Sequence, residues 1–194
     1  MNKSILLKDG FIVLPEKTLE GSIRICCETI IALGDLTPLE DETVIDCSGC
    51  YLLPGGIETH THLDLESMGT VTADDFRSGT RSALAGGTTT VIDFATQFHG
   101  ESMARGLERW HEKADGKSAI DYGFHMAMTE WNQNLRREMA SVVDGGITSF
   151  KMYMAYKGRM MVQEDDIYEA LEEAGRLGAT IGFHCENGLL IDLL

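Results

Sequence analysis

The sequence predicts an α/β protein in which a small antiparallel β unit precedes about five βα units of a parallel sheet. Two observations support this prediction. From Gly55 onward, runs rich in β-branched and aromatic residues alternate with polar, helix-forming segments, and parallel strands need crossovers of this kind. Before that point the chain has only short alternating strands. We therefore expect residues 1–50 to form a small β domain and residues 51–194 to form the α/β domain.

The composition excludes several classes of partner. The chain has 194 residues, of which 43% are hydrophobic, and its formal net charge of −15 would repel phosphate backbones and anionic lipid surfaces. The sequence contains no apolar run of membrane-spanning length. We therefore expect no nucleic acid and no membrane partner, and a cytoplasmic location. Five cysteines, an odd number, favour reduced thiols over a disulfide framework.

The first fifty residues contain short alternating segments. These are "SILLKDGFIVL", "GSIRICCETIIALG" and "ETVIDCSGCYLL", with Asp-Gly, Glu-Gly and Gly-Asp pairs as turn signals. Their pattern predicts a small antiparallel β unit.

The remaining chain repeats one pattern. Glycines at 55, 86, 116, 145 and 178 each precede a strand-like run, and they lie 29 to 33 residues apart. The intervening polar segments predict helices over 72–85, 101–114, 131–143 and 163–177. Glycine just past a helix end is suited to the left-handed C-cap conformation, which explains its place before each strand.

Two architectures fit this repeat. One is an open, doubly wound sheet of five strands. The other is the N-terminal part of a (β/α)8 barrel, because a whole barrel typically takes about 250 residues.

Chemically active side chains stand toward the carboxyl ends of the predicted strands, where α/β proteins bind ligands. They are His60 and His62 on the first strand, then Asp93, His125, Lys151 and His184 on the next four. Residues i and i+2 of a strand point to the same face, so the two imidazoles of the first strand should lie side by side. Imidazole is a common zinc ligand, and the set predicts a metal site.

Lys151 is unusual in this set because it lies within the apolar run "SFKMYM". A buried lysine must shift its pKa or find charged partners. Its amine can also react with CO₂, and the resulting carbamate is an anion with two oxygens that can bridge two cations.

These motifs together resemble a known family. "HTHLD", "TADDFRSGTRSALAGGTTTVIDF", "SFKMYMAYK" and "FHCENG" are similar to the amidohydrolase superfamily and, within it, to the D-hydantoinase and dihydropyrimidinase family. The similarity covers nearly the whole chain. It implies a (β/α)8 barrel with a side β-sandwich, to which residues 1–50 would contribute.

The resemblance also implies a site with two divalent metals, expected to be zinc. His60 and His62 match ligands of the more buried metal, His184 matches a ligand of the second, and Lys151 matches the carboxylated lysine that bridges both. Tyr156 matches the tyrosine that binds substrate and polarises its carbonyl. Residues expected to shape the substrate pocket are Leu65, Met68, Phe98, Tyr153 and Met160. His125 and Asp93 match no metal ligand, so we expect them to support the site or the fold.

The implied reaction is hydrolysis of the cyclic amide of a dihydropyrimidine or a 5-substituted hydantoin by a water activated between the metals. The resemblance places further ligands on a sixth and an eighth strand. We therefore expect this chain to be the N-terminal portion of a longer enzyme, inactive in isolation, and to form a homo-oligomer.

Three alternatives remain. The chain could be a non-catalytic homologue that acts as a binding or assembly protein. It could be an allantoinase or a dihydroorotase-like hydrolase, although Asp64 stands where a dihydroorotase-like enzyme would carry arginine. A doubly wound domain for a phosphorylated ligand is less favoured, because no phosphate-binding glycine motif follows any predicted strand.

Overall fold

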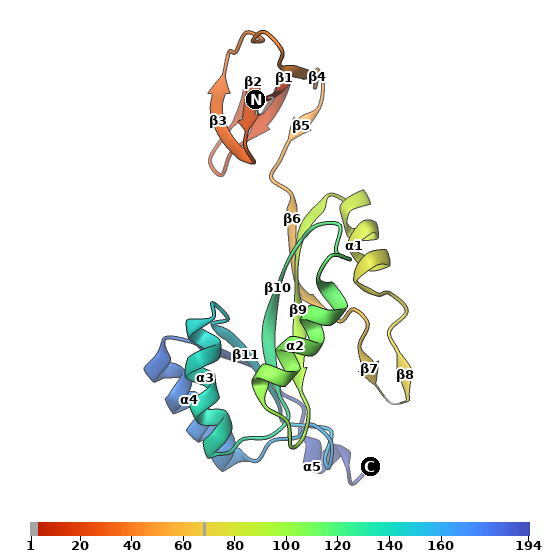
Figure 1. Cartoon of the computed structure of the whole chain (residues 1–194), viewed down its shortest axis with the longest axis vertical. Coiled ribbons are helices and arrows are strands. Elements are labelled where there is room, and N and C mark those ends of the chain that lie inside the picture. The colour runs from red at the N-terminus through yellow and green to blue at the C-terminus, as the bar shows by residue number, and fades with distance from the viewer. Residues whose placement is uncertain (1–3, 68) are drawn as a thin grey trace. The chain divides into compact units, whose positions relative to one another are not determined.

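The computed structural model describes residues 4–67 and 69–194. The chain divides into two compact units, Met1–Pro54 and Gly55–Leu194 (Figure 1). Among the described residues, no helix combines the length and the apolar character needed to cross a membrane.

The first unit is a five-stranded sheet. Its strands are β1 (Ile5–Val13), β2 (Thr18–Cys26), β3 (Thr29–Gly34), β4 (Thr43–Asp46) and β5 (Tyr51–Leu52). The predicted antiparallel pairing holds between β1 and β2 and between β2 and β3. β4 and β5 instead pair with β1 in parallel, because the segment after β3 returns the chain to the start of β1, where the Thr43 amide donates to the Ser4 carbonyl at 3.0 Å.

The second unit contains a five-stranded parallel sheet with the order β12-β11-β10-β9-β6. Its strands are β6 (Gly56–Thr61), β9 (Thr88–Gln97), β10 (Asp121–Met128), β11 (Ser149–Tyr153) and β12 (Thr180–His184). A small hairpin of β7 (Glu66–Ser67) and β8 (Thr70–Val71) follows β6. The helices are α1 (Phe76–Ala85), α2 (Met103–Ala114), α3 (Gln133–Asp144), α4 (Glu164–Leu177) and α5 (Gly188–Ile191).

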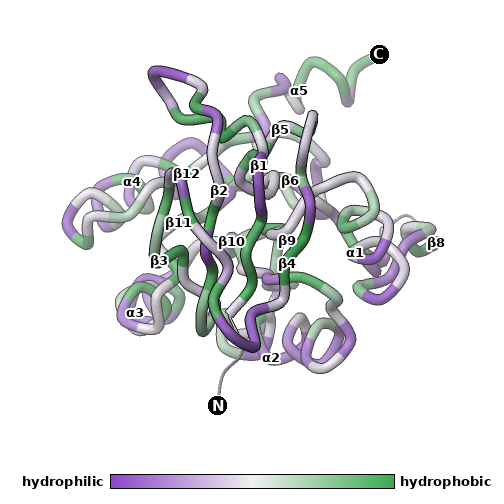
Figure 2. The backbone as a smooth tube through the Cα atoms, turned by 90° about the horizontal axis from the view of Figure 1, so that it is seen from above, coloured by the Kyte–Doolittle hydropathy of each residue, from purple (hydrophilic) through white to green (hydrophobic). Residues whose placement is uncertain are grey.

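The strand order decides between the two architectures. The five strands follow one another across the sheet in chain order, so every crossover moves in the same direction. Right-handed crossovers then place every connecting helix on the same face, whereas a doubly wound sheet reverses direction at a switch point. Figure 2 shows α4, α3, α2 and α1 in that order around the outside of the sheet. The partial barrel is therefore confirmed, and the doubly wound alternative is wrong.

The observed helices α1 to α4 begin one to four residues later than predicted. Asp75, Ser102 and Asn132 are polar residues that we expected inside the first three helices, but they are extended N-caps whose side chains accept backbone N–H groups of the first turn.

The predicted left-handed glycine caps are correct after α4, where Gly178 has φ 68°. After α1 and α3 the first glycine of each Gly-Gly pair stays right-handed, and the second, Gly87 or Gly146, takes the positive φ. In these two helices the first glycine still donates to carbonyls of the last turn, so the chain turns one residue later.

The two faces of the parallel sheet have different surroundings. Met126 and Met128 of β10 and Phe150 of β11 belong to the core formed with the helices. The intervening side chains, such as Ala127 and Lys151, alternate to the opposite face. Burial of each large apolar side chain contributes about 1.5–3 kcal/mol, so the helix face fixes the strands that carry the opposite, functional face.

Candidate active site

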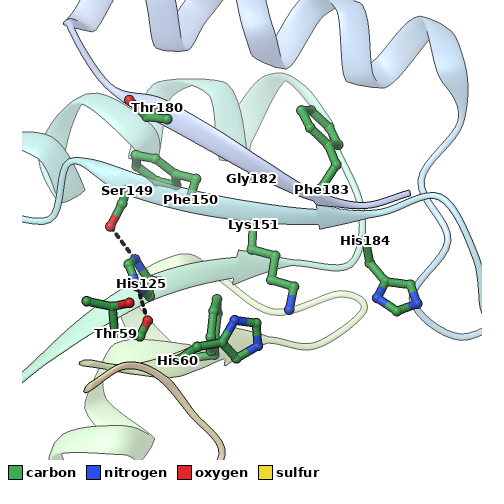
Figure 3. A pocket seen from close by; sticks show the side chains of 11 residues that line it. Thr59, His60, His125, Ser149, Phe150, Lys151, Thr180, Gly182, Phe183 and His184 are labelled. Carbon is green, nitrogen blue, oxygen red and sulfur yellow. Dashed lines mark hydrogen bonds between the residues drawn. The ribbon is translucent and has the colours of Figure 1, made fainter. Parts of the chain in front are cut away.

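Five neighbouring strands each contribute a side chain to one cavity of about 380 Å³ on the face opposite the helices. These side chains are His60 of β6, Phe94 of β9, His125 of β10, Lys151 of β11 and His184 of β12. Figure 3 shows Lys151 extending from β11 into the space between His60 and His184. The structure therefore brings together groups that lie more than 120 residues apart in the sequence.

The His-x-His pair lies where β6 ends, and its two rings are neighbours, as the i, i+2 spacing predicts. The ring centres of His60 and His62 are 5.2 Å apart. Burial lowers the pKa of both imidazoles, and the nearby positive charge of Lys151 lowers the pKa values further. Both rings are therefore biased toward the neutral form, which has a lone pair for a metal.

Lys151 is 8% exposed, and burial lowers the pKa of its amine. Within the described part of the chain, its Nζ makes no hydrogen bond or ion pair. Nζ lies 4.3 Å from the centre of the Phe94 ring and 5.3 Å from the centre of the Tyr153 ring. Of the two outcomes expected for a lysine in this apolar strand, burial without a charged partner among the described residues favours the pKa shift.

Tyr156 and His184 form the opposite edge of the site. Tyr156 follows β11 in a left-handed conformation with φ 68°, and its ring stacks on His184 with centres 5.1 Å apart. The Tyr156 hydroxyl lies 3.2 Å from His184 Nε2, which is also 2.9 Å from Glu186 Oε2.

A second cavity of about 430 Å³ shares three lining residues with the first, namely His60, Lys151 and His184. Leu65, Tyr153 and Met160, three of the predicted substrate-pocket residues, line it together with His62 and Tyr156. Burial raises the pKa of Tyr153 to about 12, so its phenol stays protonated.

Of the other two predicted pocket residues, one lies away from the cavity and the other is not described by the structure. Phe98 is not brought to the cavity: its ring lies beneath the guanidinium of Arg109, 4.7 Å from ring centre to Cζ. Met68 lies outside the described residues.

His125 lies on the cavity face, but both of its ring nitrogens are occupied. Nε2 is 2.9 Å from the Thr59 carbonyl, and Nδ1 contacts the Ser149 hydroxyl. His125 therefore ties β6 to β11, in line with the supporting role that we predict for it.

Two residues of the site were not predicted from the sequence. Phe94 forms a floor beneath the imidazoles of His60 and His62, with ring centres 4.6 and 5.0 Å away. No signal in the sequence marked it, because the pattern placed its neighbour Asp93 at the site, whereas Asp93 turns to the opposite face of β9 and is bound by Trp110 of α2. Glu186 was also missed, although it lies two residues after His184 in the same motif.

The side chains that face the cavity supply few metal donors by themselves. Among the described residues, no group of three or more His, Cys, Asp or Glu side chains is placed to hold one ion. The neutral imidazoles of His60 and His62 supply two donors, and Lys151 has the lowered pKa that carbamate formation needs. The residues thus fit a divalent metal once Lys151 supplies carboxylate-like oxygens.

The fold and the site define a known class of protein. A barrel-type parallel sheet carries a His-x-His pair, a buried lysine and a further histidine on one face, and residues 51–192 match the model of the Amidohydrolase family. The chain belongs to the amidohydrolase family.

Within this family the chain is similar to cyclic amidohydrolases. It is 44% identical over 190 residues to the D-hydantoinase of Geobacillus stearothermophilus, covering 97% of this chain and 40% of that protein. It is 40% identical over 193 residues to the dihydropyrimidinase of Rattus norvegicus, covering 96% and 37%. The solved dihydropyrimidinase from Brevibacillus agri superposes with a TM-score of 0.94 at 43% identity, covering 100% and 42%. The chain thus spans about two fifths of the length of these relatives.

Proposed function

We propose that this chain carries the first part of the active site of a metal-dependent cyclic amidohydrolase that acts on dihydropyrimidines or 5-substituted hydantoins. One observation carries the proposal: the buried amine of Lys151 shares a cavity with His60 and His184 and contacts the aromatic floor beneath both imidazoles of the His-x-His pair. The names of the relatives support the substrate class.

In this proposal His60 and His62 would hold one divalent ion, expected to be zinc, and His184 would hold a second. Lys151, as a carbamate, would supply an oxygen ligand to each. When bound, the two metals supply Lewis-acid chemistry, polarising the amide carbonyl and lowering the pKa of a water.

The carbamate forms when the lone pair of the neutral Lys151 amine makes an N–C bond to CO₂ and the nitrogen loses a proton to solvent. The charge of the side chain then changes from +1 to −1 relative to the ammonium. Because burial disfavours the ammonium form, the cavity favours the form of the amine that can react.

The remaining residues bind and orient the substrate. The Tyr156 hydroxyl donates a hydrogen bond to the carbonyl oxygen as negative charge develops there, and the neighbouring His184 ring holds the phenol in place. Leu65, Tyr153 and Met160 form the wall against the ring substituent.

The experiment combines metal content with carbamate detection. Protein purified without chelators and supplied with ¹³C-bicarbonate should bind zinc and show a ¹³C carbamate signal. Lys151→Ala should lose the signal and most of the zinc. The matched control is Lys157→Ala, because Lys157 is exposed and pairs with Asp192 at 2.7 Å. Zinc content that is unchanged in Lys151→Ala contradicts the bridging role.

Hydrolysis tests the substrate class. We expect the whole enzyme to open dihydrouracil or a 5-substituted hydantoin in preference to allantoin or dihydroorotate. A preference for either of the last two would favour the alternative hydrolases, and metal binding with no hydrolysis of any of the four would favour the non-catalytic homologue. Homo-oligomerisation is part of the proposal, and the mass of the assembly in solution tests it.

A further inference from the structure

Asp93 is completely buried in β9, yet it has no ion-pair partner among the described residues. Four donors satisfy its carboxylate instead. Oδ2 accepts from the Thr61 hydroxyl at 2.8 Å and from the Leu63 amide at 2.8 Å. Oδ1 accepts from the Phe94 amide at 2.8 Å and from Trp110 Nε1 at 2.9 Å.

Two of these donors belong to the segment that carries the His-x-His pair. Thr61 and Leu63 alternate with His60 and His62, so each donor lies directly beside an imidazole-bearing residue. One carboxylate oxygen therefore holds the residues on both sides of His62, Thr61 through its side-chain hydroxyl and Leu63 through its backbone amide. These hydrogen bonds lie on the face of the strand opposite to the imidazoles. They therefore fix the direction in which the imidazoles project.

The other oxygen holds the floor of the site. The Phe94 amide that donates to Oδ1 belongs to the residue whose ring contacts both imidazoles and the Lys151 amine. Asp93 thus connects the strand that presents the imidazoles with the aromatic ring on which they rest.

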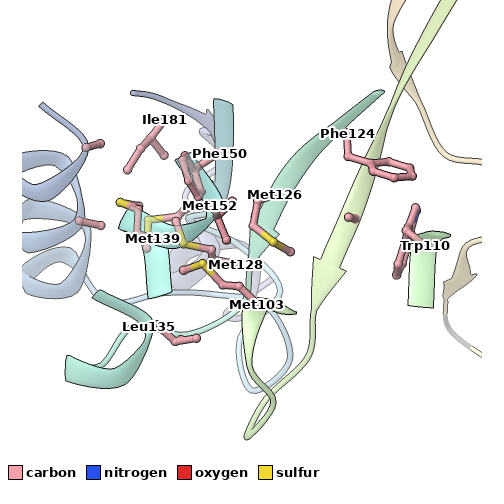
Figure 4. Packing of buried hydrophobic residues seen from close by; sticks show 14 of the residues in the cluster. Met103, Trp110, Phe124, Met126, Met128, Leu135, Met139, Phe150, Met152 and Ile181 are labelled. Atoms are coloured by element: carbon pink, nitrogen blue, oxygen red, sulfur yellow. The ribbon is translucent and has the colours of Figure 1, made fainter. Parts of the chain in front are cut away.

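The fourth donor binds the other carboxylate oxygen from the core, away from the strand that carries the imidazoles. Trp110 of α2 is 1% exposed and lies within the buried cluster between sheet and helices (Figure 4). The same helix makes a second tie to the strand-end segment, because Lys113 Nζ donates to the Asp64 carbonyl at 2.5 Å.

We propose that Asp93 is a positioning residue that fixes the directions of His60 and His62 through Thr61 and Leu63. The inference rests on the proposed function only in that these imidazoles are the proposed metal ligands. A carboxylate suits the position because four donors converge on it. Asparagine would keep one acceptor oxygen, but its NH₂ group, which only donates, would face two of the four donors without an acceptor.

The test separates an effect on the imidazole directions from an effect on the stability of the fold. It removes the hydrogen-bond donors to the two Asp93 carboxylate oxygens one at a time. Thr61→Val removes the hydroxyl on the strand that bears the imidazoles, and Thr61→Ser keeps it. Trp110→Phe removes the donor on the opposite oxygen, in the core. The readouts are zinc affinity by competition titration and, in metal-free protein, the imidazole signals of His60 and His62 in ¹⁵N-histidine NMR spectra.

We expect Thr61→Val to weaken zinc binding by about 10–100-fold, the usual effect of losing a group that orients metal ligands, and to shift or broaden both imidazole signals. Thr61→Ser should restore both readouts. Trp110→Phe should lower the urea midpoint of unfolding but leave zinc affinity and the imidazole signals unchanged. If Thr61→Val does not fold, Thr61→Ala removes the same hydroxyl.

Unchanged imidazole signals in a folded Thr61→Val or Thr61→Ala variant would overturn the inference. Equal losses of zinc affinity in Thr61→Val and Trp110→Phe would do the same, because they would show a structural role only. If the wild-type chain binds no zinc, the proposed function fails, whereas the metal-free imidazole signals still decide the role of Asp93.

Discussion

The Nζ atom of Lys151 lies 4.3 Å from the centre of the Phe94 ring, on the face of the sheet that carries the site. A cation above an aromatic ring is stabilised by about 0.5–2 kcal/mol, which favours the ammonium form. Burial acts in the opposite direction and lowers the pKa of the Lys151 amine. The same ring also contacts the imidazoles of His60 and His62, so Phe94 forms the apolar floor of the site.

Truncation of this floor should damage both the fold and the site. Phe94 is 5% exposed, so Phe94→Ala should cost about 3–5 kcal/mol of unfolding free energy, as buried Phe-to-Ala changes usually do. Zinc affinity should fall as well, because the rings of His60 and His62 lose their support. Urea denaturation and zinc titration measure the two effects.

Phe98→Ala is the matched control, since Phe98 lies four residues further along the chain and contacts Arg109 rather than the cavity. It should leave zinc affinity unchanged. Equal zinc affinities for the two variants would show that Phe94 is not part of the site.

Tyr156→Phe should separate catalysis from stability. The change removes only the hydroxyl that lies 3.2 Å from His184. If this hydroxyl stabilises the developing oxyanion, kcat for dihydrouracil should fall by about 10²–10³-fold. Tyr156 is 41% exposed, so the free energy of unfolding should change by no more than about 0.5 kcal/mol.

The control for this change is Tyr168→Phe, which removes an exposed hydroxyl that donates to Glu172 at 3.1 Å. Its kcat should equal that of the wild type. A comparable kcat for Tyr156→Phe would remove Tyr156 from the catalytic machinery.

The periodic features of the fold were predictable from the sequence, because they depend on local physics. The glycine spacing and the β-branched runs predicted the five strands, and strand alternation predicted that His60 and His62 lie together. The strand order was not predictable from this pattern, since the same repeat fits a barrel or a doubly wound sheet. Only the pairing of β6 with β9 and of the strands that follow decides between them.

The candidate site was predictable only in part. Residues with reactive side chains, such as Lys151 and His184, were evident from their types and places at strand ends. Phe94 has no reactive group, and its contribution depends on which side chains pack against it in three dimensions. Phe98 is the opposite case: we expected it in the pocket, but its ring contacts Arg109, because a residue in a loop after a strand can turn away from the cavity.

The first unit should become less stable in acid, because protonation of the Glu42 carboxylate weakens its pairing with Arg24. The Arg24 guanidinium donates to Glu42 at 2.7 and 3.0 Å and holds the pKa of Glu42 at about 2, below its ordinary value of 4.5. The depressed pKa contributes stability above pH 4.5, and this contribution is lost as the pH falls from 4.5 to about 2. Hydrogen exchange of β1 and β2 amides, measured across this range, should show the loss.

Glu42→Gln should exchange faster than the wild type at pH 6, and the difference should disappear toward pH 2. Glu40→Gln, at an exposed neighbouring position, is the control and should match the wild type throughout. If the difference in exchange rate between Glu42→Gln and the wild type stays constant with pH, the ionisation of Glu42 is not the source of the acid sensitivity.

Two helical glycines, Gly106 and Gly175, should differ in how a change to alanine alters the free energy of unfolding. A Cβ at Gly106 of α2 would lie 3.0 Å from the Thr96 carbonyl oxygen, because the helix packs closely on the end of β9, whereas a Cβ at Gly175 of α4 would meet nothing within 4 Å. Alanine in a helix interior is favoured over glycine by about 0.8–1 kcal/mol, so Gly175→Ala should stabilise by up to that amount. Gly106→Ala gains the same helix propensity but must also push the helix from the strand, at a cost of about 1–3 kcal/mol, so it should be neutral to destabilising. Urea midpoints of the two variants test this packing, and a Gly106→Ala variant as stable as Gly175→Ala would show that α2 does not pack closely on β9.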